Sequence, residues 1–215
     1  GFDLVGTTTM GVDLGPNSLN LTRNNSPSFI QKGNPGSIVG TAFNGSNQYL
    51  SVPLSYPINH ATDCGFGTWI YLDSVTRVHG IARAGSTTPN WQIIYYYGSV
   101  SSRYFEFGYW DTGGTYRMIK TKSWNTTGWV YVGMTLSHGG SGNNQFSLVV
   151  NDDIQQVNNI AYTVPRAAVG DFELGRSGPT GTYYLLGKMT TAWMAGNPIQ
   201  QHIDYYAATR GYYEY

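Results

Sequence analysis

Apolar and polar residues alternate in short runs along most of the chain. The runs are rich in β-branched and aromatic residues, and turn-forming residues such as Gly, Asn and Asp separate them at intervals of roughly ten residues. This pattern predicts an all-β fold of antiparallel sheets, either a sandwich or a barrel. The clearest predicted strands are Gln48–Val52, Gly67–Leu72, Trp91–Tyr97, Tyr104–Trp110, Thr115–Thr121, Trp129–Leu136, Gln145–Val150, Phe172–Gly175 and Gly187–Met194.

One short helix is predicted near the C-terminus. Asn197 can cap it, Pro198 suits its first position, and Gly211 lies just past its expected end. The apolar residues of this helix are spaced so that they fall on one face, and we expect that face to pack against the sandwich. The residues of that face are Ile199, Ile203 and Tyr206.

The first 35 residues are rich in Gly, Thr, Asn and Pro. They predict loops with one strand around Ser18–Thr22. Neither a linker nor an internal repeat is visible, so we expect one domain over residues 1–215.

Charged residues make up only 11% of the chain, and 12 basic residues balance 12 acidic ones. Without a basic stripe, nucleic acid is not an expected partner. Nor does any apolar run reach the ~18 residues that a membrane span needs. No signal peptide is expected from the first residues. The polar groups of the surface must therefore be mainly hydroxyls and amides. Such a surface is suited to binding sugars or to close contact with another protein.

Cys64 is the single cysteine, so no internal disulfide is expected. It lies in a segment that reads as a strand, and cysteine is among the most buried residue types. We therefore expect a packing role for Cys64.

Six segments, in this order, resemble the laminin G-like jelly-roll domains and their pentraxin relatives, within the concanavalin A-like lectin and glucanase superfamily. They span most of residues 12–211. The resemblance implies a two-sheet jelly roll with one closing helix. Such folds serve as lectins, adhesion domains, glucanases and virus surface proteins, so fold alone does not choose a function. The segments are Gly40–Pro53, Thr68–Asp73, Trp124–Gly133, Phe146–Asp152, Phe172–Arg176 and Leu186–Ile199.

An enzyme of this fold would need two carboxylates about 5 Å or about 6.5–9.5 Å apart to cleave a glycosidic bond. The chain has only three Glu, namely Glu106, Glu173 and Glu214, and no strand carries two acids at alternate positions. Glu106 lies in the middle of a predicted strand, where a surface or hydrogen-bonded role is the simpler interpretation. We expect no catalytic residues.

Resemblance to the pentraxins raises the question of calcium, which needs several oxygen ligands. The corresponding stretch, Arg176–Gly181, has no carboxylate. We therefore expect no cofactor and no metal site of that type. The alternative of a structural calcium ion held by Asp13, Asn17 or backbone carbonyls stays open.

Strand alternation predicts two faces for the aromatic segment between residues 91 and 121. One face is predicted to be core, with Trp91, Ile93, Phe105, Phe107 and Met118. The other is the candidate ligand-binding face, because aromatic rings cover the apolar faces of pyranoses and polar groups address hydroxyls. Burial of this face against loops or another subunit is the alternative. Its residues are Gln92, Tyr96, Tyr104, Glu106, Trp110 and Arg117.

Taken together, these features predict a non-catalytic carbohydrate-binding or adhesion module. In its low charge, its abundant Ser, Thr, Asn, Gly and Tyr, its single Cys and the absence of a visible signal peptide, the chain resembles bacteriophage tail-fibre, spike or head-decoration domains. We therefore expect a location on a virion surface or outside the cell, with host glycans and other virion subunits as partners, and a homo-oligomer as an open alternative. The competing hypotheses are a purely structural virion protein and a secreted bacterial lectin-like module.

Overall fold

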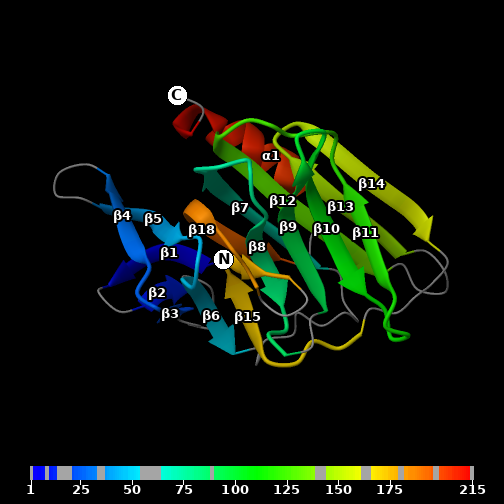
Figure 1. Cartoon of the computed structure of the whole chain (residues 1–215), viewed down its shortest axis with the longest axis horizontal. Coiled ribbons are helices and arrows are strands. Elements are labelled where there is room, and N and C mark those ends of the chain that lie inside the picture. The colour runs from blue at the N-terminus through cyan, green and yellow to red at the C-terminus, as the bar shows by residue number, and fades with distance from the viewer. Residues whose placement is uncertain are drawn as a thin grey trace.

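The structure is a computed structural model of the whole chain. It describes residues 2–7, 10–13, 21–32, 37–53, 64–87, 90–138, 144–160, 166–178, 182–195 and 199–213. Two large antiparallel sheets and one short C-terminal helix make up this part, which confirms the predicted fold class. In Figure 1 the helix lies at the upper end of the sandwich, near the C-terminus.

The first sheet runs from β11 at one edge to β3 near the other. Hydrogen bonds pair its strands in the order β11-β10-β9-β8-β15-β6-β3. All the pairs between them are antiparallel. The strands are β11 (Tyr116–Lys120), β10 (Ser102–Trp110), β9 (Trp91–Ser99), β8 (His79–Ala84), β15 (Asp171–Leu174), β6 (Tyr49–Pro53) and β3 (Leu21–Asn24).

The second sheet has the order β18-β7-β12-β13-β14, and β1 and β2 connect it to β3 of the first sheet. Strand β5 adds to β18, and β4 adds to β5. A separate two-stranded hairpin is formed by β16 (Arg176–Ser177) and β17 (Tyr183–Tyr184). The remaining strands are β18 (Leu186–Ala195), β7 (Cys64–Leu72), β12 (Gly128–His138), β13 (Asn144–Val150), β14 (Asp153–Ile160), β1 (Phe2–Thr7), β2 (Met10–Asp13), β4 (Ser28–Lys32) and β5 (Ser37–Asn44).

Aromatic rings from both sheets fill the space between them. Phe66 of the second sheet lies 5.9 Å from Trp91 and 6.0 Å from Phe172 of the first, measured between ring centroids. Phe107 and Tyr109 of β10 meet Phe146 of β13 edge to face. Such tilted pairs are the favoured geometry of aromatic packing. The two sheets are therefore held at a fixed separation by interlocking rings.

All nine strands predicted from the pattern are present, and Cys64 is buried as expected. Of the predicted core face, Trp91, Ile93, Phe105 and Phe107 are fully buried. The assignment of Met118 to the core is wrong, because its side chain is 46% exposed.

The reason is the pairing of β10 with β11. Phe107 lies opposite Ile119, and Gly108 lies opposite Met118. The inward residues of β11 are therefore Arg117 and Ile119, one position away from the predicted ones. A one-residue error in register reverses every face assignment along a strand.

The expectation of loops over the first 35 residues is also wrong for the described part. Strands β1, β2 and β4 lie there, and β3 starts at Leu21, inside the predicted strand around Ser18–Thr22. Residues 14–20 lie outside the described residues. Strand β1 pairs with its neighbour β2 and with the distant β18, and β4 pairs with the next strand, β5, so pairing with other strands compensates for weak local propensity.

The helix α1 (Ile199–Thr209) packs on the outer face of the second sheet and continues into the 3₁₀ turn η1 (Arg210–Tyr212). The predicted cap residues Asn197 and Pro198 lie outside the described residues, and Gly211 falls inside η1. The buried face contains His202 and Tyr206, whereas Ile203 is only half-buried. A Cβ on Gly133 of β12 would collide with the His202 ring, so glycine allows this close approach.

An ion pair is buried on the outer face of the first sheet. Glu173 accepts from Arg83 Nε at 2.5 Å and from Arg176 Nη1 at 3.0 Å, and the side chains of Arg83 and Glu173 are 1% and 2% exposed. Arg83 also donates to the carbonyl of Gly178, in the segment between β16 and β17. The pair therefore fastens the β16–β17 hairpin to the sheet.

We predict that Glu173→Gln lowers the free energy of unfolding by about 3–5 kcal/mol, because Arg83 would stay buried without a compensating charge. Urea unfolding monitored by tryptophan fluorescence measures the change. Asp171→Asn on the same strand removes one charge without breaking a described ion pair, and serves as the control. A loss below about 1 kcal/mol for Glu173→Gln would show that the pair is dispensable.

Two buried histidines are neutral because burial lowers the pKa of each to about 4. His79 Nε2 donates to the carbonyl of Ser74 at 2.8 Å, and its Nδ1 accepts from the backbone of Leu186 at 3.1 Å. The Nδ1 atom of His202 lies 2.8 Å from the hydroxyl of Tyr131. Each imidazole therefore joins segments that are distant in sequence.

We predict that stability falls as the pH drops from about 6.5 to about 4. In this window the histidines of the unfolded chain become protonated, whereas His79 and His202 of the folded chain stay neutral. Each of the two therefore lowers the free energy of unfolding by about 3 kcal/mol at the acidic end of the window. Urea unfolding at a series of pH values measures the slope. The slope should be reduced by roughly half in His202→Gln, and an unchanged slope in that variant would contradict the assignment.

Candidate functional site

Five of the six residues predicted to bind a ligand share the outer face of β9 and β10. Register places Gln92 opposite Gly108 and Tyr96 opposite Tyr104, with Glu106 and Trp110 at alternate positions of β10. Arg117 does not join them, because it lies opposite Tyr109, whose side chain is buried in the core. At the sheet edge Arg117 instead forms an ion pair with Asp111 at 3.4 Å.

The polar groups of this face bond to one another. Tyr116 donates to Glu106 Oε1 at 2.6 Å and accepts from Gln92 Nε2 at 3.0 Å. Gln92 Oε1 in turn accepts from Ser177 and Gly178 next to β16. Gln92 and Glu106 are 3% and 5% exposed, and burial raises the pKa of Glu106. This network leaves few polar atoms of the face open to a ligand.

The aromatic rings of the face are also occupied. Tyr104 stacks on Tyr96 at 5.0 Å, and the Lys120 ammonium lies 4.8 Å from the Tyr104 centroid. Trp110 packs on Tyr116 at 4.5 Å, and the Arg166 guanidinium lies 5.1 Å from the Trp110 ring. Rings packed in this way offer mainly their edges to a sugar, whereas stacking on a pyranose requires a free ring face.

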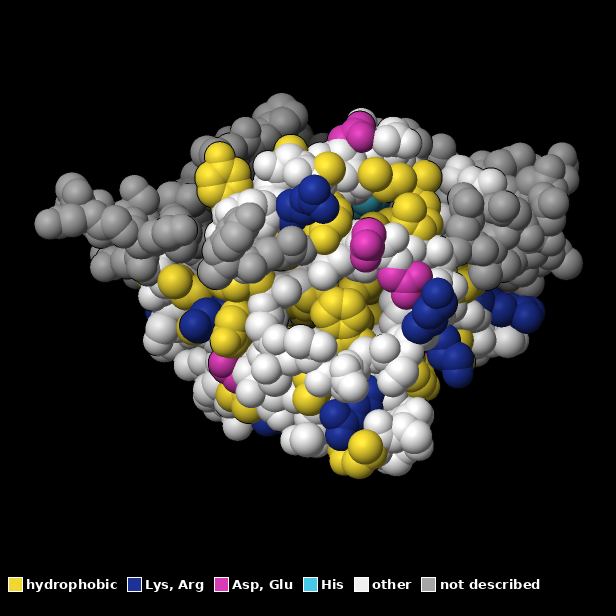
Figure 2. Space-filling model, turned by 90° about the horizontal axis from the view of Figure 1, so that it is seen from above, with side chains coloured by type: hydrophobic (Ala, Val, Ile, Leu, Met, Phe, Trp, Pro, Cys, Tyr) yellow, Lys and Arg dark blue, Asp and Glu magenta, His cyan; other side chains and the backbone are white. Residues whose placement is uncertain are grey.

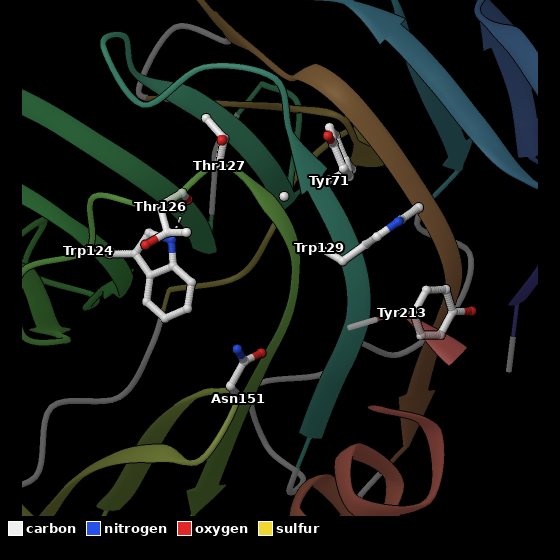
Figure 3. Close-up of a pocket in the computed structure, with 8 residues that line it drawn as sticks. Tyr71, Trp124, Thr126, Thr127, Trp129, Asn151 and Tyr213 are labelled. Atoms are coloured by element: carbon white, nitrogen blue, oxygen red, sulfur yellow. Dashed lines mark hydrogen bonds between the residues drawn. The ribbon is translucent and has the colours of Figure 1, made fainter. Parts of the chain in front are cut away.

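An open aromatic hollow lies at a different place, at the end of the sandwich that is uppermost in Figure 1. Its volume is about 410 Å³, within the range of about 300–1,000 Å³ for ligand sites. In Figure 3 Trp124 and Thr126 stand on one side, Trp129 and Tyr213 on the other, and Asn151 at the lower end. We call this site the aromatic hollow; it is lined by Tyr71, Trp124, Thr126, Thr127, Gly128, Trp129, Asn151 and Tyr213.

Strand ends position one wall of the hollow. Tyr71 near the end of β7 lies opposite Trp129 at the start of β12, and their rings meet edge to face at 5.4 Å. Tyr213, just after η1, packs 5.1 Å from Trp129 and stacks 4.6 Å from Trp69. Helix α1 thus brings the C-terminal part of the chain to the site.

The segment between β11 and β12 forms the opposite wall. Trp124 packs edge to face on Phe105 of the core at 5.6 Å, and its Nε1 donates to the carbonyl of Thr126 at 2.9 Å. The Trp124 carbonyl accepts from the buried Tyr95 hydroxyl at 3.0 Å. These contacts hold the Trp124 ring in place before any ligand arrives, which lowers the entropic cost of binding.

Asn151 closes the hollow from the β13–β14 turn. Its backbone has a φ of 53°, a left-handed conformation that Asn tolerates better than most residues. Its side-chain oxygen accepts from the Tyr131 backbone at 2.8 Å, which orients the amide. A carboxamide fixed in this way can address ligand hydroxyls through its NH₂ group.

Figure 2 looks down on this end of the molecule. Hydrophobic side chains gather in the middle of the view, polar atoms surround them, and charges of both signs are scattered. A concave, mostly apolar site with a few convergent polar groups is the usual form of a small-molecule site.

Sequence reasoning missed the aromatic hollow. It read Asn125–Gly128 and Asn151–Asp153 as turns, although Asp153 starts β14, and it gave no ligand role to Trp124 or Trp129. The available signal was two tryptophans flanking a polar turn, Trp-Asn-Thr-Thr-Gly-Trp. A Tyr from the C-terminal end cannot be added to that signal without knowing where α1 docks.

Within the described ranges, no three His, Cys, Asp or Glu side chains lie close enough to hold a metal ion. Asn17, one residue of the calcium alternative, lies outside those ranges. No helix of the described part is long and apolar enough to span a membrane. The two described glutamates, Glu106 and Glu173, are both buried and hydrogen-bonded.

No family model and no curated protein matches the chain. Solved structures of similar fold include the binding domain of botulinum neurotoxin serotype D, with a TM-score of 0.69 and 11% identity over 96% of this chain and 51% of that one. A botulinum neurotoxin type C structure, from work on cell entry that depends on two ganglioside molecules, has a TM-score of 0.69 and 9% identity over 96% and 50%. Trypanosoma rangeli sialidase in complex with sialic acid has a TM-score of 0.66 and 14% identity over 98% and 32%.

The chain spans about half the length of the neurotoxin chains that it matches. At these identities the likeness shows the fold alone. The fold is a β-sandwich of the kind found in these neurotoxin binding domains and in this sialidase.

Proposed function

We propose that the chain is a non-catalytic glycan-binding module and that the aromatic hollow is its sugar site. The observation that carries this proposal is the placement of two tryptophans, two tyrosines and a fixed amide around one open cavity. Aromatic rings pack on the C–H faces of pyranoses, and amide and hydroxyl groups bond to sugar hydroxyls. The neighbours of known fold include proteins described with gangliosides or sialic acid, which supports a glycan ligand.

The low charge of the chain supports the same ligand class. Sugars are recognised through hydrogen bonds and apolar contact, and neither needs a charged surface. The buried state of Glu106 and Glu173 supports a binding function rather than glycoside hydrolysis, which requires two carboxyl groups facing a substrate.

We predict that Trp129→Ala weakens glycan binding at least tenfold, which corresponds to about 1.4 kcal/mol. A glycan array identifies the ligand, and calorimetry with the best oligosaccharide measures the affinity. Trp129→Phe keeps an aromatic ring and should retain most of the binding, so it separates loss of contact from loss of fold.

Tyr104→Ala is the matched control, because it removes a half-buried ring from the sheet face predicted from the sequence. If the aromatic hollow is the site, Tyr104→Ala binds as the original chain does. If Tyr104→Ala loses binding and Trp129→Ala does not, the ligand occupies the face of Gln92, Tyr96, Tyr104 and Glu106. An array without any binding would overturn the proposed function.

We further propose that the module works on a virion surface, where it attaches to host glycans beside other virion subunits. The supporting observation is the composition, with 11% charged residues and a surface that relies on Ser, Thr, Asn, Gly and Tyr. A secreted lectin-like module is the alternative.

Antibodies against the module should label intact phage particles in immunogold electron microscopy. Free module added in excess should reduce adsorption of those particles to their host, because both compete for the same glycan. Label on secreted bacterial material, and none on particles, would contradict the virion location.

A further inference from the structure

The lining of the aromatic hollow carries no formal charge. Its side chains end in aromatic rings, phenol and threonine hydroxyls and one carboxamide. An ionised carboxylate that entered this site would lose its hydration shell and would find no cationic side chain in the lining. Moving a charged group from water into such a site costs free energy. A neutral sugar hydroxyl loses less hydration and can regain hydrogen bonds from the amide of Asn151 and the hydroxyls of the wall.

The lysines nearest to lining residues in the chain lie outside the lining itself. Lys188 is half-buried, and its ammonium lies 4.6 Å from the centroid of the Tyr71 ring, where it is already engaged. Exposed Asp73 follows the end of β7 two residues after Tyr71, and exposed Asp152 directly follows Asn151. Exposed Lys122 precedes Trp124 by two residues.

Charges of both signs therefore lie close to lining residues along the chain, and Figure 2 likewise shows Lys or Arg and Asp or Glu side chains on this end of the molecule. Such a surface does not concentrate anions, because a raised local concentration requires a cleft lined by one sign of charge. The volume of about 410 Å³ is near the lower limit for ligand sites, so the occupant is small.

We propose, resting on the glycan-binding function above, that the hollow takes an uncharged pyranose of one or two rings and disfavours acidic sugars. This selectivity is opposite to that suggested by the neighbouring fold of the sialidase, whose structure holds the anionic sugar sialic acid. The difference follows from the lining residues of this chain and not from the fold.

The test uses the full chain and matched pairs of oligosaccharides, for example N-acetyllactosamine with and without a terminal sialic acid, across an array of such pairs. We expect the neutral member to bind at least tenfold more tightly wherever a pair binds. Raising the salt concentration from about 0.02 to about 0.5 M should change the affinity of the neutral member less than twofold, because it has no charge to screen.

Asp152→Asn supplies a second readout. It should strengthen binding of the acid-capped member severalfold and leave the neutral member unchanged, since it removes a negative charge beside the hollow. Equal or tighter binding of acid-capped sugars by the original chain would overturn the proposed selectivity while leaving the glycan-binding function intact. Failure of every pair to bind would overturn the function itself.

Discussion

The interlocking of aromatic rings between the two sheets is the constraint on which the rest of the structure depends. Phe66 of the second sheet contacts both Trp91 and Phe172 of the first, which also contact each other, and Phe107 meets Phe146 across the layers. Interiors packed at this density respond to changes of a single methylene, so the sheets cannot slide freely. The strand ends at the rim are consequently held at defined positions, including those that form the aromatic hollow.

Charged residues are few, and some of them are buried. The ion pair of Glu173 and Arg83 holds the β16–β17 hairpin on the sheet, and Glu106 accepts a hydrogen bond from the Tyr116 hydroxyl. These buried groups close the outer face of the first sheet with internal hydrogen bonds and cation–ring contacts. The proposed ligand site lies at the rim instead, where connecting segments on a rigid scaffold commonly carry function.

The same sandwich recurs in neurotoxin binding domains and in a sialidase at low identity, so its ligand must be determined by the side chains at each site. In this chain those side chains are uncharged and aromatic at the hollow. Helix α1 contributes to the site as well, because its docking through His202 and Tyr206 places Tyr213 against Trp129. The docking of the helix therefore shapes the wall of the aromatic hollow.

Alternation and turn residues predicted antiparallel sheets, the main strands and the burial of residues such as Trp91 and Phe105, because period-two patterning reports directly on a half-buried sheet. The choice of a two-sheet sandwich over a barrel came from the resemblance of six segments to laminin G-like domains. The sequence did not reveal strand β1, which pairs with the distant β18, or strand β4, which pairs with the next strand, β5. Nor did it reveal the register that turns Met118 outward and Arg117 inward. The aromatic hollow depended entirely on tertiary structure. Tyr71, Trp124, Asn151 and Tyr213 come from four separate segments, and only the packing of two sheets and a helix brings such distant residues to one point.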